Sequence, residues 1–177
     1  MKTPIIYVVA LAASVLTASQ AHSQQHALTL GGRYHARHTS YTELPYDKGD
    51  LSAVVGYEYH EAMAFWQLLV GYTPEVSEGD DGRGLGVDDV ITPQINLLFK
   101  ENNWAAGVGA LASYIEYEDK ELDDWTDVYW QVMFGYQIPL PAFRVELMLY
   151  YPFEKWKNFS DFDARDLEFG LMLRRMF

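Results

Sequence analysis

The sequence predicts an all-β protein whose eight strands close into an antiparallel up-and-down barrel, and three observations support this prediction. Apolar and polar residues alternate with a period of two through most of the chain. Tyr, Trp, Val, Ile and Phe are enriched in the alternating segments, whereas Gly and Pro lie between them. The connections alternate between long and short, as in a barrel that carries loops at one end and tight turns at the other.

The alternating segments are predicted to be strands because none of them shows a helical stripe or a capping box. They cover residues 27–39, 50–60, 62–73, 87–100, 104–117, 126–138, 142–153 and 165–177. Their length of about 10 to 14 residues suits a tilted membrane crossing, which needs roughly 9 to 11 residues. Pro93 lies inside the fourth segment and has no backbone N–H to donate, so we expect a bulge there.

The N-terminal segment predicts a secretory signal peptide. It starts MKTPIIYVV, has an apolar run from Ile5 to Leu16, and ends with small residues at Ser19 and Ala21. The run is shorter than the roughly 20 residues that a membrane-anchoring helix needs. We expect cleavage after Ala21, with Ser23 as an alternative position, so that residues 22–177 form a single domain.

Composition excludes several classes of function. The chain has 13 Lys and Arg against 25 Asp and Glu, a formal charge of −12, and a protein this acidic is a poor ligand for nucleic acid. It has no Cys, so neither a disulfide nor a thiolate site is expected. It has no phosphate-binding glycine loop, zinc-type His cluster or dinucleotide fingerprint, so we expect no cofactor. No stretch after the signal peptide is apolar over the length of a spanning helix, so a membrane crossing would have to use strands.

The positions of the lysines indicate which face of the barrel meets lipid. All lysines after the signal peptide lie in connections or at strand ends, whereas the water-facing wall of a soluble barrel would carry some in mid-strand. The mid-strand polar residues are near charge balance, which suits a closed lumen better than a solvated face, the alternative. They are Arg33, His35, Arg37, Glu58, Gln67, Gln94, Asn96, Gln131, Gln137, Arg144, Glu146, Glu168 and Arg174.

An ion-pair cluster is predicted at mid-height in this lumen. Its expected members share one parity and lie at similar distances from the turn ends of their strands. They are Arg33, Glu58, Arg144, Glu146 and Arg174. Because the interior of an eight-stranded barrel is just filled by side chains, we expect a plugged lumen and not an open channel.

The last strand carries a recognisable motif, in which Phe169, Leu171, Leu173 and the terminal Phe177 share one parity. With the signal peptide and the eight alternating strands, the chain resembles the small eight-stranded outer-membrane barrels of the OmpA and OmpX type. The resemblance implies a multi-pass barrel in the bacterial outer membrane, in contact with its lipid and lipopolysaccharide, with short periplasmic turns and longer extracellular loops. It also implies that the barrel-assembly machinery recognises the last strand. Arg175 departs from the pattern, because the class usually has an apolar or aromatic residue there.

Aromatic residues gather near the strand ends, where the two membrane interfaces are expected. The predicted periplasmic ring is Tyr59, Phe99, Trp104, Tyr136, Phe143 and Phe177. The predicted outer ring is Tyr72, Tyr114, Trp130, Tyr151, Phe153 and Trp156.

The predicted function is a non-enzymatic one, either structural or in surface interactions through acidic extracellular loops. Carboxylates are dense in two connections, where Asp80, Asp81, Asp123 and Asp124 are candidate ligands for a hard cation such as calcium. Such a cation would also bridge the loops to lipopolysaccharide. The spacing matches no established cation loop, so a solvated acidic loop is the alternative.

Two other functions stay open. A lipid A-modifying barrel enzyme, a deacylase or acyltransferase, would need a histidine near a hydroxyl. His38 and Ser40 are two residues apart at the end of the first strand and would point the same way. A narrow pore for small apolar solutes would open laterally where Gly107, Gly109 and Gly135 leave space in the wall, although glycines at barrel bends explain them equally well.

Overall fold

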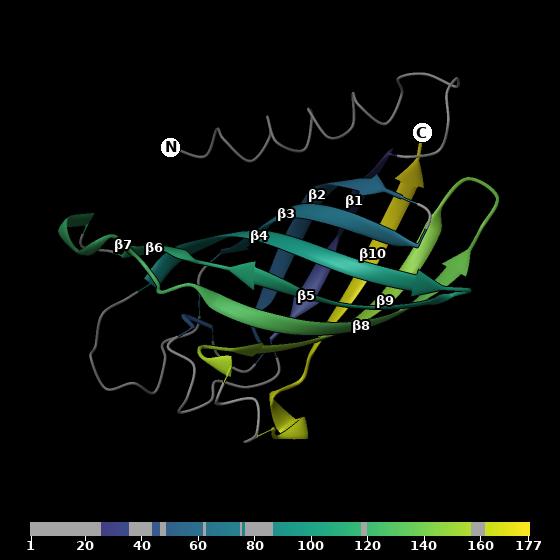
Figure 1. Cartoon of the computed structure of the whole chain (residues 1–177). Coiled ribbons are helices and arrows are strands. Elements are labelled where there is room, and N and C mark those ends of the chain that lie inside the picture. Colours follow the sequence, from purple (N-terminus) through teal and green to yellow (C-terminus); the bar gives the residue numbers. More distant parts are fainter. Residues whose placement is uncertain are drawn as a thin grey trace.

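The computed structural model describes residues 26–35, 44–46, 49–61, 63–74, 76, 87–117, 120–156 and 162–177. Eight strands form the wall of a barrel (Figure 1). They are β1 (His26–Tyr34), β2 (Leu51–His60), β3 (Ala64–Pro74), β4 (Val87–Glu101), β5 (Trp104–Leu111), β8 (Tyr129–Pro139), β9 (Arg144–Phe153) and β10 (Glu168–Met176). Outside the wall lie the short strands β6 (Tyr114–Tyr117) and β7 (Asp124–Trp125) and the 3₁₀ turns η1 (Lys120–Leu122) and η3 (Ala164–Asp166). None of the described helical segments is long and apolar enough to cross a membrane.

The sheet closes on itself. The order β3-β2-β1-β10-β9-β8-β5-β4 returns to β3, because β3 also pairs with β4. The first and last strands pair antiparallel from Ala27↔Met176 to Tyr34↔Phe169. Every wall strand therefore has two neighbours, which removes the open edges that a sheet otherwise presents. The predicted fold class, an eight-stranded antiparallel up-and-down barrel, is confirmed.

The two ends of the barrel differ in their connections. At one end, called the turn end here, short links at residues 61–63, 102–103 and 140–143 join β2 to β3, β4 to β5 and β8 to β9. The first and last strands meet at this end, where Phe177 N donates to His26 O at 3.0 Å. The opposite end, called the loop end, carries the longer connections, which include residues 35–50 and 75–86.

The predicted fifth strand is interrupted in the structure. β5 pairs with β4 as far as Gln94↔Leu111, and β6 resumes the pairing at Ile91↔Tyr114. Pro93 lies opposite the gap and has no N–H to donate, which accounts for the break. The bulge predicted at Pro93 is not found, because β4 pairs with β3 without a shift through Val70↔Pro93. β6 and β7 extend beyond the body of the barrel (Figure 1).

The two faces of the wall differ sharply in exposure. On β10, Phe169, Leu171 and Leu173 are exposed and the residues between them are buried. The same pattern runs around the barrel. Exposed apolar side chains include Leu30, Tyr57, Trp66, Leu68, Val70, Ile95, Phe99, Trp104, Val108, Trp130, Phe134, Ile138 and Leu147. An apolar surface this extensive is rare on monomeric soluble proteins.

Side chains fill the lumen, and many of them are apolar. One buried cluster lies within the barrel and consists of Val54, Phe65, Leu69, Leu98, Ala105, Met133, Met148, Tyr150 and Met172. A second cluster lies toward the loop end and consists of Leu44, Tyr46, Val76, Val90, Leu111, Ile115 and Tyr129. The inward face is therefore a mixture of apolar and polar layers and is less uniformly polar than strand alternation predicts.

Two predicted aromatic positions differ from expectation. Tyr151 and Phe153 are only 7% and 3% exposed, so they do not belong to an exposed outer ring. The connection that follows β9 covers them: the ring centroid of Phe162 lies 4.7 Å from that of Tyr151, and the centroid of Trp156 lies 4.9 Å from that of Phe153. Strand alternation carries no information about such packing by a loop.

Candidate functional site: the polar layers of the lumen

Arg174 is the centre of a polar layer near the turn end. Its side chain is 0% exposed, and β10 directs it into the lumen between β2 and β9. Its Nε lies 2.6 Å from Glu58 Oε2, and its Nη2 donates to Glu146 Oε2. His60 Nε2, at the end of β2, lies 2.8 Å from Glu58 Oε2 and adds a second contact to that carboxylate. We call these residues the Arg174 layer.

Neighbouring strands satisfy the remaining carboxylate oxygens of the Arg174 layer. Thr29 Oγ1 donates to Glu58 Oε1 at 2.6 Å, and Gln67 Nε2 donates to the same oxygen at 2.8 Å. Gln137 Nε2 donates to Glu146 Oε1 at 2.9 Å. Buried ions are tolerated when each has a partner and further hydrogen bonds, and both carboxylates of the layer meet these conditions. Arg174 Nη1 has no hydrogen-bond partner among the described residues. With these hydrogen bonds the layer joins side chains from six strands across the lumen.

A second polar layer surrounds Arg33, nearer the loop end. Arg33 Nε donates to Glu168 Oε2, and Arg33 Nη1 donates to Gln131 Oε1 at 3.0 Å and to Gln94 Oε1 at 3.3 Å. The guanidinium carbon also lies 4.2 Å from the ring centroid of Tyr150, which is a cation–π distance. We call this group the Arg33 layer.

The structure distributes the five predicted cluster residues over different surroundings. Glu58, Glu146 and Arg174 lie together, whereas Arg33 pairs with Glu168 in the other layer. Arg33 faces Gly170 across β1 and β10 while Arg174 faces Thr29, so the two arginines are four residues apart, about 13 Å at 3.3 Å per residue. The odd or even position of a residue in a strand predicts which face its side chain occupies. It does not predict how high along the barrel axis the side chain lies.

Arg144 differs from the other predicted members. It lies opposite Arg174 across β9 and β10 and is half-buried. Among the described side chains, no ion pair joins it to Glu58 or Glu146. Its position at the first residue of β9 places it at the turn end, beside solvent and not within the layer.

A residue of the first loop closes the lumen at the loop end, and strand alternation gives no signal for it. Tyr46 is 5% exposed, and its ring stacks on that of His35 with centroids 3.8 Å apart. Its hydroxyl forms a hydrogen bond with Thr92 Oγ1 and lies 3.3 Å from Ser113 Oγ. Burial raises the pKa of the Tyr46 phenol, although the hydroxyls of Ser113 and Thr92 oppose the shift.

Only some of the candidate catalytic and cation-binding residues lie among the residues that the structure describes. His38, Ser40, Asp80 and Asp81 lie outside the described residues. Asp123 Oδ1 accepts from Tyr117 N at 3.0 Å and Asp124 Oδ1 accepts from Trp125 N at 2.7 Å, so both carboxylates serve the local turn. In the described part of the chain, no group of three or more His, Cys, Asp or Glu is arranged to hold a metal ion.

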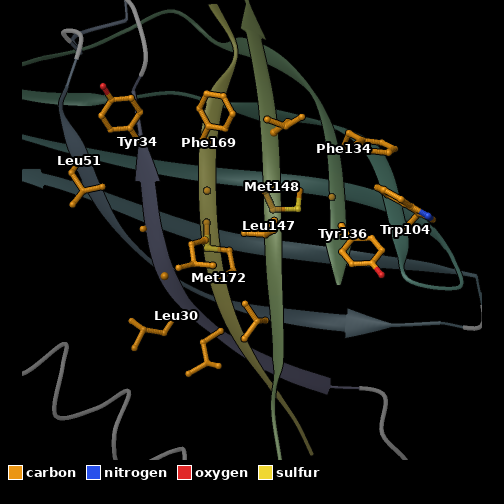
Figure 2. Close-up of a pocket in the computed structure, with 18 residues that line it drawn as sticks. Leu30, Tyr34, Leu51, Trp104, Phe134, Tyr136, Leu147, Met148, Phe169 and Met172 are labelled. Carbon is orange, nitrogen blue, oxygen red and sulfur yellow. The ribbon is translucent and has the colours of Figure 1, made fainter. Parts of the chain in front are cut away.

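The outer wall carries an apolar depression of about 920 Å³ that is centred on β10 and β9 (Figure 2). Phe169, Leu171 and Leu173, three residues of the predicted assembly signal, line it. Figure 2 shows Leu30, Tyr34 and Leu51 on one side of it and Trp104, Phe134 and Tyr136 on the other. The surface that these residues form is suited to acyl chains and not to polar ligands.

Comparisons with known proteins add to the geometry. No model of a known protein family matches the sequence, and no curated protein is significantly similar to it. The crystal structure of Neisserial surface protein A (NspA) matches with a TM-score of 0.57 at 10% identity and covers 89% of this chain and 100% of that chain. Ail, the attachment invasion locus protein of Yersinia pestis, solved with the heparin analogue sucrose octasulfate, matches with a TM-score of 0.49 at 15% identity and covers 87% of this chain and 99% of that chain. At this identity the likeness to NspA shows the fold alone, and this chain has the fold of the small eight-stranded outer-membrane β-barrels.

Proposed function

We propose that this protein is an integral barrel of the bacterial outer membrane, with a side-chain-filled lumen and a structural or surface-interaction role at its loop end. One observation carries the proposal. Leu68, Phe169 and Leu171 are 54%, 52% and 56% exposed on the outside, while Glu58, Glu146 and Arg174 are 0% exposed on the inside. Lipid favours this arrangement because it solvates apolar side chains and excludes charges, whereas water favours the reverse.

Membrane fractionation combined with gel mobility tests this proposal. We expect the mature chain in the outer-membrane fraction, and we expect unboiled protein to migrate faster than boiled protein because the closed barrel resists unfolding in detergent. A mature chain that is dissolved and monomeric without detergent would contradict the proposal.

An acidic surface at the loop end supports the proposed surface role. Beside β6 and β7 lie the carboxylates of Glu116, Glu121, Asp123, Asp124 and Asp127. Trp125 and Val128, in the same segment, are 55% and 58% exposed. Such a surface suits contact with lipopolysaccharide through divalent ions. Calorimetric titration with calcium tests whether this surface binds divalent ions. The absence of heat would show that the acidic loops are only a solvated surface.

The terminal strand supports the proposed recognition by the barrel-assembly machinery. Phe169, Leu171, Leu173 and Phe177 all lie on the outer face, with exposures of 52%, 56%, 42% and 37%. Their side chains remain available on the finished wall, so another protein could contact them before the barrel closes.

The alternative functions gain no support from the described residues. His38 and Ser40, the candidates for lipid A modification, lie outside them. The glycines suggested for a lateral pore leave no free space. A Cβ at Gly107 would lie 2.1 Å from Leu97 O, and one at Gly135 would lie 2.4 Å from Met148 Sδ. Neighbouring atoms already fill both positions.

A further inference from the structure

Three side chains at the loop end form a chain of contacts that none of the functions above uses. His35 Nε2 lies 2.7 Å from Ser52 Oγ, and His35 Nδ1 lies 3.1 Å from Glu168 Oε1. Ser52 Oγ also shares a hydrogen bond of 2.6 Å with Thr73 Oγ1. A hydroxyl, an imidazole and a carboxylate in this order are the parts of an activated serine nucleophile. The Nδ1 contact is too bent for a regular hydrogen bond. Such contacts in unliganded sites commonly tighten when substrate binds.

The fold holds these three residues in place from three strands. Ser52 is the second residue of β2, Glu168 is the first residue of β10, and His35 directly follows β1. His35 is anchored through its backbone, because its N–H donates to Asp50 O and its carbonyl accepts from Gly49 N, both at 2.9 Å. Each side chain is at most 3% exposed. Tyr46, in the first loop, covers the imidazole, with ring centroids 3.8 Å apart.

A small space borders the serine. A Cβ added at Gly71 would lie 3.8 Å from Ser52 Cβ and 3.7 Å from Gln94 Nε2, which are ordinary contact distances. A methyl-sized group therefore fits between the serine and the amide. An amide N–H at this point is the kind of donor that stabilises an oxyanion. The apolar cluster at the loop end, which includes Val90 and Leu111, also contains Tyr46, whose ring stacks on His35.

We propose that Ser52 is a nucleophile activated by His35 and oriented through Glu168, and that the loop end of the lumen hydrolyses short-chain carboxylic esters. Ser52 Oγ bonds to the ester carbonyl carbon as its proton passes to His35 Nε2. The alcohol leaves with that proton, and an acyl ester on Ser52 remains. Water then attacks this ester, passes a proton to His35, and releases the carboxylic acid while Ser52 regains its hydrogen. Ser52 and His35 are the catalytic residues, and Glu168 is a positioning residue.

Labelling with a short-chain alkyl fluorophosphonate tests the proposal on the full barrel in detergent, with heat-dependent gel mobility as the check of folding. We expect the probe to bond to Ser52 with loss of fluoride, and mass spectrometry of peptides to place it there. Ser52→Ala should abolish labelling, and His35→Ala should slow it by at least about 100-fold. Tyr46→Ala should accelerate it because the cover is removed. Hydrolysis of p-nitrophenyl acetate should follow the same order.

Two matched controls separate catalysis from general damage to the lumen. Ser113 is equally buried at the same end, but its hydroxyl bonds to the hydroxyls of Thr92 and Tyr46, so Ser113→Ala should leave labelling unchanged. Gly71→Ala should slow labelling by filling the space beside Ser52. Gly32→Ala should not, because Gly32 lines the outer wall and its Cβ would lie 3.6 Å from the backbone carbonyl oxygen of Ser52, an ordinary contact distance.

The positioning role of Glu168 has a separate readout. Glu168→Gln should slow labelling, and Glu168→Asp should restore part of the rate because it keeps a carboxylate beside the imidazole. A variant that merely perturbs the lumen would not be rescued by the shorter carboxylate.

The result that overturns the proposal is clear. If folded wild-type protein and the Tyr46→Ala variant react with the probe no faster than the Ser52→Ala variant, or if the label maps to Ser113, then Ser52, His35 and Glu168 only fill the lumen.

Discussion

Single buried charges in this barrel depend on partners contributed by other strands. Arg174 is fully buried and contacts two carboxylates, Glu58 and Glu146, that are also fully buried. Its guanidinium carbon lies 4.8 Å from the ring centroid of Phe65, which closes the remaining side. Removing the arginine would leave two unpaired carboxylates in a medium of low dielectric constant, which is more costly than losing the pair as a whole.

Substituting Arg174 should therefore destabilise the barrel strongly. We expect Arg174→Met to lower the free energy of unfolding by about 3 to 5 kcal/mol, the usual cost of breaking a buried pair. Urea unfolding of the protein in lipid vesicles measures this. Arg144→Met is the matched control, because Arg144 lies opposite Arg174 on the next strand but is only half-buried. Equal effects of the two substitutions would show that the Arg174 layer has no special role.

At the scale of elements, two consecutive inward positions of β5, Gly107 and Gly109, leave no room for a side chain beside β4. A Cβ at Gly107 would lie 2.1 Å from Leu97 O and 2.7 Å from Leu98 Cα, both backbone atoms that cannot move aside without distorting the sheet. Gly109 is equally constrained, with Asn96 Oδ1 at 1.9 Å. These glycines serve strand packing.

A substitution at this contact should disturb the pairing of the two strands. We expect Gly107→Ala to destabilise the barrel by about 1 to 3 kcal/mol through overpacking. Gly71→Ala should be nearly neutral, because its Cβ would meet no atom closer than 3.7 Å. Unfolding measurements on both variants make the comparison. Similar stabilities would show that β4 and β5 can separate without cost.

The outer face of β10 offers a direct test of the solvent that surrounds the wall. Leu171, at the middle of the strand, is 56% exposed, and Leu140, in a turn, is 49% exposed. If lipid surrounds β10, Leu171→Arg should cost about 2 to 4 kcal/mol in vesicles and Leu140→Arg about 0 to 1 kcal/mol, because the penalty depends on depth in the bilayer. A neutral or stabilising effect at Leu171 would place water outside the wall.

At the scale of the whole molecule, the strands close into a ring and side chains fill the lumen that the ring encloses. The ring of eight strands leaves no edge to pair with another sheet. Two polar layers and two apolar clusters occupy the interior, and the first loop covers the loop end with Tyr46. An eight-stranded barrel is just wide enough for its side chains, so the filled lumen follows from the strand number.

This filling predicts the electrical behaviour of the barrel. We expect little steady conductance when the purified protein is inserted into a planar bilayer, because buried side chains of both polar layers and of the apolar cluster within the barrel fill the described part of the lumen. A stable open channel would contradict a plugged lumen. Tyr46→Ala should not open a channel, since the Arg174 layer still closes the turn end.

The amino-acid sequence by itself determined the strand number, the fold class and the two faces of the wall. The period of two assigned Phe169 and Leu171 to one face and Glu168 and Arg174 to the other, and the structure has this arrangement. These features are local, because each depends only on the alternation of neighbouring side chains and on the residues that form turns.

Only the tertiary structure decided which residues meet inside. The register between β1 and β10 separates Arg33 from Arg174 along the barrel. Arg33 therefore forms its ion pair with Glu168. The break opposite Pro93 and the insertion of Tyr46 also depend on segments far apart in the chain. The physical reason is that the height of a side chain is set by hydrogen-bonded pairing around the closed ring, and alternation along one strand contains no information about that pairing.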